Sequence, residues 1–257
     1  MIKKRLVGVV TVKDGWAVQS FGYRRYLPLG KPEVLVENLD RWGVDEVLLQ
    51  CIDRTPRGLG PDFDVLARII RRGISTPLIY SGGIRNVADG VAAIKAGGDR
   101  ICIDALLHED TSTVVRLAQV LGSQALVASL PVSRDECSLS WLDYRSGRGS
   151  DLSDELLVLL RSGTISEVLL IDWRHEGFRG GFDLALLPLF PVPNVPLIAF
   201  GGLSEVEHLR AALQSEHVVA VAVGNFLSYE EHAVQHLKTS LASLPLRSAS
   251  YERTIWY

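Results

Sequence analysis

Two stretches of the sequence decide the fold, Pro77-Leu78-Ile79-Tyr80-Ser81-Gly82-Gly83-Ile84 and Pro196-Leu197-Ile198-Ala199-Phe200-Gly201-Gly202-Leu203. In both, a short apolar run ends in two glycines, and the offset between them also relates Asp53 to Asp172. A fixed offset of this kind indicates a duplicated structural unit. The sequence therefore predicts two similar halves.

Short apolar runs rich in β-branched residues recur along the chain, and each is followed by a loop and then by a helical pattern. The eight runs are residues 6–12, 47–52, 77–80, 101–103, 125–130, 168–171, 196–200 and 218–223. Amphipathic patterns with capping residues occupy 62–72, 86–96, 110–121, 151–161 and 204–214. Strict alternation predicts a parallel α/β sheet covered by helices, and eight such units close into a (β/α)8 barrel, the TIM barrel.

The chain length fits one such barrel. We expect a single domain over residues 1–257, with half-barrels at about 1–121 and 122–245 and a C-terminal tail at 246–257. A doubly wound open sheet is the alternative, but it would not explain the repeat. In a barrel, the active site lies at the mouth formed by the carboxyl ends of the strands.

The composition is ordinary for a soluble globular protein, with 47% hydrophobic and 22% charged residues. A net charge of −3 provides no field for nucleic acid or an anionic membrane, so neither is an expected partner. The cysteines Cys51, Cys102 and Cys137 are far apart and odd in number, which favours a reducing cytoplasm. The first apolar run ends at Lys13-Asp14, too soon for a signal peptide or a membrane span.

Metal and nucleotide motifs are absent from the sequence. The histidines show no HxH or HExxH spacing, so no metal site is expected. There is no GxxxxGK[ST] loop, no GxSxG elbow and no GxGxxG after the first strand. ATP, esterase and dinucleotide functions therefore have no support, and no cofactor is expected.

Glycines follow several predicted strands at the mouth. They are Gly82 and Gly83 after the third strand, Gly201 and Gly202 after the seventh, and Gly224 after the eighth. Such turns let backbone N–H groups approach a phosphate, so two facing turns favour a ligand with two anionic ends. Alternatively, the glycines only permit tight turns. Asp104, at the end of the fourth strand, would place a negative charge beside a phosphate at the first turn.

Four charges stand directly before predicted strands, at the opposite end of the barrel. They are Arg5, Glu46, Arg100 and Glu167. If they point inward, they form a ring of two cations and two anions at the floor, where pairing offsets the desolvation of each charge. The alternative is a solvated rim, which is the usual place for such charges.

Acid–base chemistry at a barrel mouth needs carboxylates from different strands that face a common substrate. The candidates are Asp53 at the end of the second strand, Asp172 at the end of the sixth, and Glu176 in the loop that follows. The alternative for the two aspartates is that they cap the loops after their strands.

The repeat, the glycine turns and the four charges together resemble the cyclase subunit of imidazole glycerol phosphate synthase. The resemblance runs from Lys4 to about Leu237 and includes, in order, Val12-Lys13-Asp14-Gly15, Gly30-Lys31-Pro32, Gly43-Val44-Asp45-Glu46, Gly82-Gly83-Ile84, Gly98-Asp99-Arg100, Gly122-Ser123-Gln124-Ala125, Gly177 and Gly201-Gly202. In that family the barrel takes ammonia from a glutaminase docked beneath it and passes it through a charged ring at the floor. The ammonia is used on a bis-phosphate substrate at the mouth.

The resemblance implies roles for individual residues. Arg5, Glu46, Arg100 and Glu167 match the ring that gates ammonia, with Arg100 where the family usually has lysine. Asp99 matches a floor residue that faces the glutaminase, and Gln124 matches one implicated in signalling to it. Gly177 joins the glycines that bind phosphate.

The mouth departs from the family pattern. The two catalytic aspartates of the family map to Thr11 and Pro131, and neither side chain can act as a general acid or base at neutral pH. Three further family residues are replaced, by Gln19, Asp104 and Phe200. These changes argue against cyclisation and binding of the usual substrate.

A divergent branch resembles the chain more closely, in Tyr26 with Gly30 and Pro32 and in Ile52-Asp53 followed by Pro61-Asp62-Phe63. Its cyclase-like proteins work with a glutaminase-like partner and an amidotransferase in making acetamidino sugars of bacterial surface polysaccharides. We therefore expect an ammonia-delivering synthase subunit with a glutaminase partner, a third amidotransferase protein, and a phosphorylated or sugar-like ligand. A true cyclase with displaced carboxylates and a non-catalytic scaffold remain the alternatives.

Overall fold

The computed structural model describes residues 3–136 and 138–248. Cys137 and residues 249–257 of the predicted tail lie outside the described residues. The described start of that tail lies at the floor, where Leu246 forms a parallel bridge with Lys4. No helix in the described part of the chain is long and apolar enough to cross a membrane.

Eight parallel strands form the centre of the molecule. They are β1 (Arg5–Lys13), β4 (Glu46–Cys51), β5 (Leu78–Ser81), β6 (Arg100–Ile103), β7 (Leu126–Asp135), β10 (Glu167–Asp172), β11 (Leu197–Phe200) and β12 (Val218–Val223). Each pairs in parallel with the next in this series, and β12 pairs with β1. The sheet is closed, so the predicted (β/α)8 barrel is confirmed. The duplication of its halves stays a prediction.

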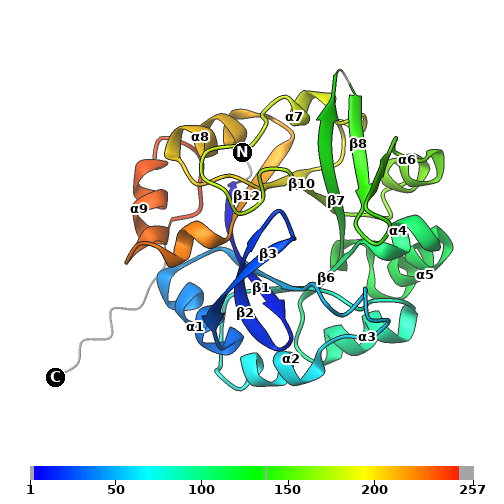
Figure 1. The fold of residues 1–257 in the computed structure, drawn as a ribbon, viewed down its shortest axis with the longest axis horizontal. Helices are drawn as coiled ribbons and strands as arrows, with labels where there is room; N and C mark the ends of the chain where they lie inside the picture. The colour runs from blue at the N-terminus through cyan, green and yellow to red at the C-terminus, as the bar shows by residue number, and fades with distance from the viewer. Residues whose placement is uncertain (1–2, 137, 249–257) are drawn as a thin grey trace.

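Helices surround the barrel, as Figure 1 shows. The main ones are α1 (Pro32–Trp42), α2 (Phe63–Ile70), α3 (Val87–Lys95), α5 (Thr111–Leu121), α6 (Asp154–Arg161), α8 (Val206–Gln214) and α9 (Ala233–Ser240). Several begin at a side chain that accepts a hydrogen bond from the first turn, namely Asp62, Asn86, Asp110 and Ser153. Shorter elements are α4 (Ala105–Glu109), α7 (Leu186–Leu189), η1 (Ser123–Ala125) and η2 (Asn225–Ser228).

Antiparallel extensions at the mouth were not predicted. The strands β2 (Trp16–Phe21) and β3 (Arg25–Gly30) fold back on β1, and β8 (Ser138–Asp143) and β9 (Arg148–Ser150) fold back on β7. Figure 1 shows the β2–β3 hairpin near the centre of the ring of helices. Each extension lies between an expected strand and the helix that follows it, where the alternation of strands and helices predicts only a loop.

The core has two layers. The outer layer packs helices against strands, and the inner layer fills the barrel with side chains from alternate strand positions. Members of the inner layer include Val7, Leu48, Ile79, Cys102 and Leu169. This layer lies in the middle of the barrel, between the charged floor and the cavity at the mouth.

Candidate functional site at the floor and mouth of the barrel

The four predicted floor charges meet inside the barrel. Arg5 Nη1 donates to both carboxylate oxygens of Glu46 at 3.0 and 2.9 Å, and Arg5 Nη2 donates to Glu167 at 2.7 Å. Arg100 Nη1 lies 2.8 Å from Glu167 and 3.7 Å from Glu46. The four side chains are only 9 to 16% exposed and form a closed ring of alternating sign. They point inward, not into a solvated rim.

Burial and pairing compete in this floor ring. Burial acts to lower the pKa of the Arg5 guanidinium, but the carboxylates of Glu46 and Glu167 outweigh it and the pKa is raised. For Glu46 burial prevails over the nearby guanidiniums, so its pKa is raised. Each charge of the ring therefore relies on its oppositely charged neighbours to offset the cost of its desolvation.

A serine supports the floor ring, although sequence reasoning missed it. Ser166 Oγ accepts a hydrogen bond from Arg100 Nη2 at 2.7 Å and donates to the Leu126 carbonyl at 2.7 Å. Ser166 stands directly before Glu167 in the sequence, and this position could have indicated that it lies beside the floor ring. Arg100 is thus held both by charge and by a hydroxyl anchored to the backbone.

The two predicted interface residues lie at the same end of the barrel. Asp99 is exposed, and its carboxylate accepts the Leu78 N–H at 2.8 Å. The Gln124 carbonyl accepts Arg100 Nε at 3.1 Å. Gln124 and Ser166 line a floor cavity of about 380 Å³. Hydrogen bonds therefore link the floor ring to residues that line the floor cavity.

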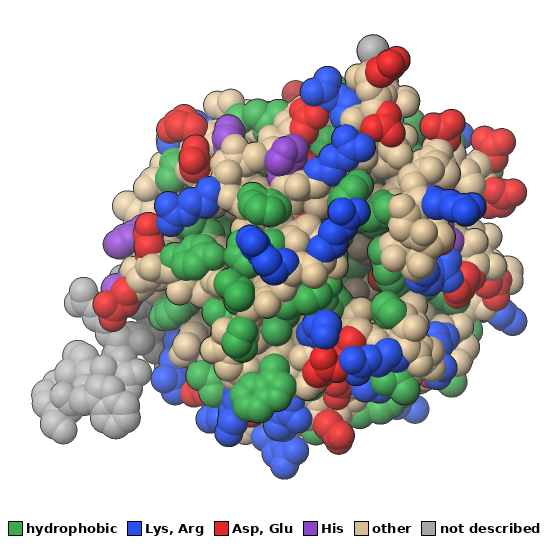
Figure 2. Space-filling view, in the orientation of Figure 1, with side chains coloured by type: hydrophobic (Ala, Val, Ile, Leu, Met, Phe, Trp, Pro, Cys, Tyr) green, Lys and Arg blue, Asp and Glu red, His purple; other side chains and the backbone are tan. Residues whose placement is uncertain are grey.

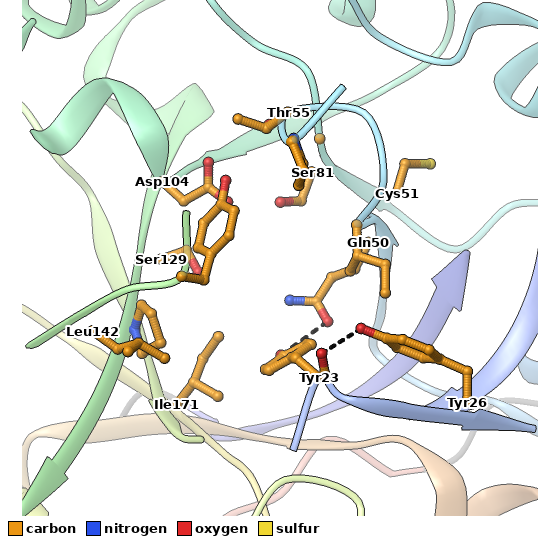
Figure 3. A pocket seen from close by; sticks show the side chains of 15 residues that line it. Tyr23, Tyr26, Gln50, Cys51, Thr55, Ser81, Asp104, Ser129, Leu142 and Ile171 are labelled. Atoms are coloured by element: carbon orange, nitrogen blue, oxygen red, sulfur yellow. Dashed lines mark hydrogen bonds between the residues drawn. The ribbon is translucent and has the colours of Figure 1, made fainter. Parts of the chain in front are cut away.

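A cavity of about 220 Å³ opens at the mouth and is shown in Figure 3. Its polar wall combines hydroxyls, one amide, one thiol and one carboxyl, from Tyr23, Tyr26, Gln50, Cys51, Thr55, Ser81, Asp104, Ser129 and Tyr144. Pro131 and Ile171 contribute apolar surface. Among the described residues, no Lys, Arg or His lines this cavity.

The first glycine turn is already engaged by the protein. Gly82 lines the mouth cavity, while the Gly83 N–H donates to Thr55 Oγ1 at 3.1 Å. The Asp104 carboxyl faces the same space and caps α4 through the Ala105 N–H. Burial raises the pKa of Asp104. The predicted conflict between Asp104 and a phosphate here is present in the structure.

The glycines of the second half surround a smaller cavity. Gly177, Gly202 and Gly224 line a space of about 30 Å³ together with Arg179 and Glu176. Gly201 lies outside its wall, because its backbone packs against the Asp172 carbonyl. This cavity therefore contains a guanidinium and glycines that let a ligand come close to the backbone, a combination that suits one anionic group.

The two predicted catalytic aspartates are not brought together at the mouth. Asp53 accepts hydrogen bonds from the Asp14 N–H at 3.1 Å and from Arg57 at 3.2 Å. Asp172 accepts from His175 Nδ1 at 2.7 Å and from the Asp183 N–H at 2.8 Å. Neither aspartate lines a described mouth cavity. These contacts fit the alternative interpretation, in which both aspartates cap the loops after their strands.

Glu176 is the predicted carboxylate that does face the mouth. It is 2% exposed, lines the smaller cavity and accepts Ser20 Oγ at 2.9 Å and the Tyr23 N–H at 3.1 Å. It therefore ties the β2–β3 hairpin to the loop after β10. Burial raises its pKa even though these hydrogen bonds act in the opposite direction.

The raised pKa of Glu176 predicts a pH-dependent effect of Glu176→Gln. When the pKa of a carboxyl is higher in the folded chain than in the unfolded chain, the fold loses stability as pH rises from the lower pKa to the higher one. Glutamine does not titrate, so the variant does not suffer this loss. Relative to the wild type, Glu176→Gln should therefore have a larger free energy of unfolding at pH 8 than at pH 4. Urea titrations at both pH values measure it, and a difference independent of pH would contradict the prediction.

Three arginines without carboxylate partners among the described residues lie over aromatic rings, and one of them, Arg179, lines the smaller cavity. The distances from guanidinium carbon to ring centre are 5.7 Å for Arg24 and Trp173, 5.0 Å for Arg25 and Phe21, and 5.8 Å for Arg179 and Phe226. Figure 2 shows basic and hydrophobic side chains intermingled across this face. Among the described residues, these three arginines form no ion pair. Sequence reasoning missed this feature, although the adjacent Arg24-Arg25 was a visible signal.

Metal ligands do not gather in the described part of the chain, where no three His, Cys, Asp or Glu side chains are arranged around a common point. Cys51 and Cys102 are buried, and burial raises the pKa of each thiol. The arrangement therefore offers ion pairing, hydrogen bonding and buried carboxylates, among them Glu46 at the floor and Glu176 at the mouth.

Known proteins resemble the chain over nearly its whole length. It is 27% identical to the putative imidazole glycerol phosphate synthase subunit hisF2 of Vibrio vulnificus, over 96% of this chain and 91% of that protein. It is 28% identical to the imidazole glycerol phosphate synthase subunit HisF of Exiguobacterium sp., over 97% and 98% of the two chains. The histidine biosynthesis protein family matches residues 5–233. The chain belongs to the histidine biosynthesis protein family.

Proposed function

We propose that this barrel is the synthase subunit of a glutamine amidotransferase system. In this proposal a glutaminase docks at the floor and releases ammonia, which passes the ring of Arg5, Glu46, Arg100 and Glu167 and reacts at the mouth. The closed floor ring is the observation that carries the proposal. The similarity to subunits named for imidazole glycerol phosphate synthase supports it.

The geometry of the floor supports docking there. Gln124 borders the floor cavity and bonds through its carbonyl to Arg100. A partner that displaces Gln124 would therefore act directly on a member of the floor ring. Such a link is what coupling between a docked glutaminase and an ammonia gate requires.

The mouth supports a role outside histidine biosynthesis. Thr11 lines the smaller mouth cavity and Pro131 lines the larger one, which contains Asp104 as its one carboxyl among the described residues. An enzyme that lacks its general acid or base loses about 10² to 10⁴ in rate. We propose that the barrel supplies ammonia for acetamidino sugar formation together with a third, amidotransferase protein.

The alternative, a true cyclase with displaced carboxylates, has less support. It relies on Asp53 and Asp172, whose side chains already accept hydrogen bonds in the loops that they cap. Complementation of a histidine auxotroph lacking its own cyclase distinguishes the two functions. We expect no growth from the well-expressed barrel, and robust growth would favour the cyclase.

Reconstitution with a glutaminase tests the proposed function. We expect the purified barrel to bind a glutaminase subunit of the imidazole glycerol phosphate synthase type and to raise its rate of glutamine hydrolysis at least about tenfold. Size-exclusion chromatography and glutamate release measure binding and rate. Failure of both with glutaminases from several relatives would refute the proposal.

A pair of matched charge reversals locates the docking surface. Arg161 is exposed and borders the floor cavity, whereas Arg148 is exposed on β9 at the mouth. Arg161→Glu should weaken glutaminase binding by about tenfold or more, and Arg148→Glu should leave it unchanged. Equal effects of the two reversals would place the partner elsewhere.

A further inference from the structure

We propose that the ligand at the mouth carries its negative charge at one end only, and that its other end is an uncharged, hydroxyl-bearing group held in the 220 Å³ cavity. This inference rests on the proposed function, because it concerns the ligand of the same mouth. It defines the substrate class as a sugar-like molecule with a single anionic group.

The wall of the mouth cavity suits hydroxyl groups. Hydroxyls of Tyr23, Ser81 and Ser129 and the amide of Gln50 all face it, and such groups can both donate and accept hydrogen bonds. The Tyr144 hydroxyl is buried beside Asp104 and makes no hydrogen bond of ordinary length and angle with any described residue. A ligand hydroxyl would satisfy it.

The same end of the cavity opposes a phosphate. Phosphate sites normally use free backbone N–H groups and a cation. Here the Gly83 N–H already donates to Thr55, and the Asp104 carboxyl lines the same cavity, where it would repel an anion. Arg145, beside Tyr144, pairs with Asp143 and Glu109 and does not line the cavity.

The other end of the mouth contains a cation. Arg179 lines the smaller cavity with Gly177 and Gly202, and no described carboxylate pairs with it. The Glu176 carboxylate also lines this cavity, but it accepts hydrogen bonds from Ser20 Oγ and the Tyr23 N–H. Arg179 is instead held over the rings of Phe226 and Tyr229. A single anionic group fits this end, so the mouth is electrostatically asymmetric.

The size of the mouth cavity limits the neutral group. Its volume of about 220 Å³ lies below the ~300–1,000 Å³ of pockets that enclose drug-sized ligands. In Figure 3 the Asp104 and Thr55 side chains lie at one side and those of Tyr23, Tyr26 and Gln50 at the other. This space accommodates a group of about the size of one sugar ring, contacted by polar atoms from opposite sides.

Two sugar phosphates that differ by one phosphate group test the proposal. Isothermal titration with fructose 6-phosphate and fructose 1,6-bisphosphate should show that the full chain binds the monophosphate at least about tenfold more tightly. Asp104→Asn keeps an oxygen that can accept the Ala105 N–H, so the fold should persist. This variant should raise the ratio of bisphosphate affinity to monophosphate affinity at least about tenfold over that of the wild type.

Asp135→Asn is the matched control. Asp135 is an exposed carboxylate paired with Arg174 near the mouth, outside both cavities, so its neutralisation should leave the ratio of the two affinities unchanged. Equal affinities in the wild type, millimolar or weaker binding of both probes, or an unchanged ratio in Asp104→Asn would each overturn the proposal. A failed glutaminase reconstitution would refute the proposed function but would leave this ligand selectivity intact.

Discussion

Replacing Arg5 with methionine should lower the free energy of unfolding by about 3–5 kcal/mol. Arg5 is the only member of the floor ring that donates at 3.0 Å or less to both carboxylates among the described residues. Methionine fills much of the same volume but leaves Glu46 and Glu167 with Arg100 as their shared cation. Urea denaturation measures the change.

The loss should widen with rising pH. Glu46 already has a raised pKa in the folded chain because it is buried, and removal of Arg5 raises it further. A carboxyl of this kind costs stability as pH rises from its unfolded-state pKa to its folded-state pKa, and the cost is absent at lower pH. A loss that is the same at pH 4 and pH 8 would contradict this account.

Arg41→Met is the control for this prediction. Arg41 also pairs with a glutamate, Glu37, but its side chain is 70% exposed. An exposed ion pair contributes about 1 kcal/mol or less, so the control should lose little stability. Similar losses in the two variants would show that burial of the floor ring has no special effect.

The second large effect is expected from Gly201→Ala. A Cβ at this position would lie 2.3 Å from the Asp172 carbonyl oxygen, and the residue has φ +105°. Backbone strain and overpacking should together lower the free energy of unfolding by about 2–5 kcal/mol. The barrel should still fold at low temperature, with an earlier unfolding midpoint in urea.

Gly163→Ala separates the two causes. Gly163 has φ +74°, but a Cβ there would meet nothing within 4 Å. It should lose only the cost of left-handed backbone, about 1–2 kcal/mol. If Gly163→Ala is as destabilising as Gly201→Ala, the close approach of β11 to β10 is not responsible for the larger effect.

The barrel and its floor could be predicted because both follow from short-range pattern. Strand and helix alternation fixes the closed parallel sheet, and a charge directly before a strand lies at the floor whichever residues surround it. The sequence suggested that Arg5 and Glu167 point inward and pair. The distances between them came only from the structure. Ser166 was missed because its role depends on where the Arg100 side chain ends.

The mouth could be predicted less well. Side chains alternate between the two faces of a strand. Glu167 points inward, and Asp172 follows it after an odd number of positions, so Asp172 points outward. This signal was present in the sequence and argues against Asp172 as a mouth residue. The β2–β3 hairpin could not be read from local pattern, because its position depends on contacts with Glu176, which is distant in the chain.

The closed floor ring also constrains how the sequence can diverge. Each carboxylate serves two guanidiniums, so a neutral replacement at one of the four positions leaves a buried charge short of a partner. Lineages should therefore retain the sign of all four charges or exchange them jointly. Among the described residues, no such ring of paired charges lines the mouth cavities, so their walls can change one residue at a time while the floor stays fixed.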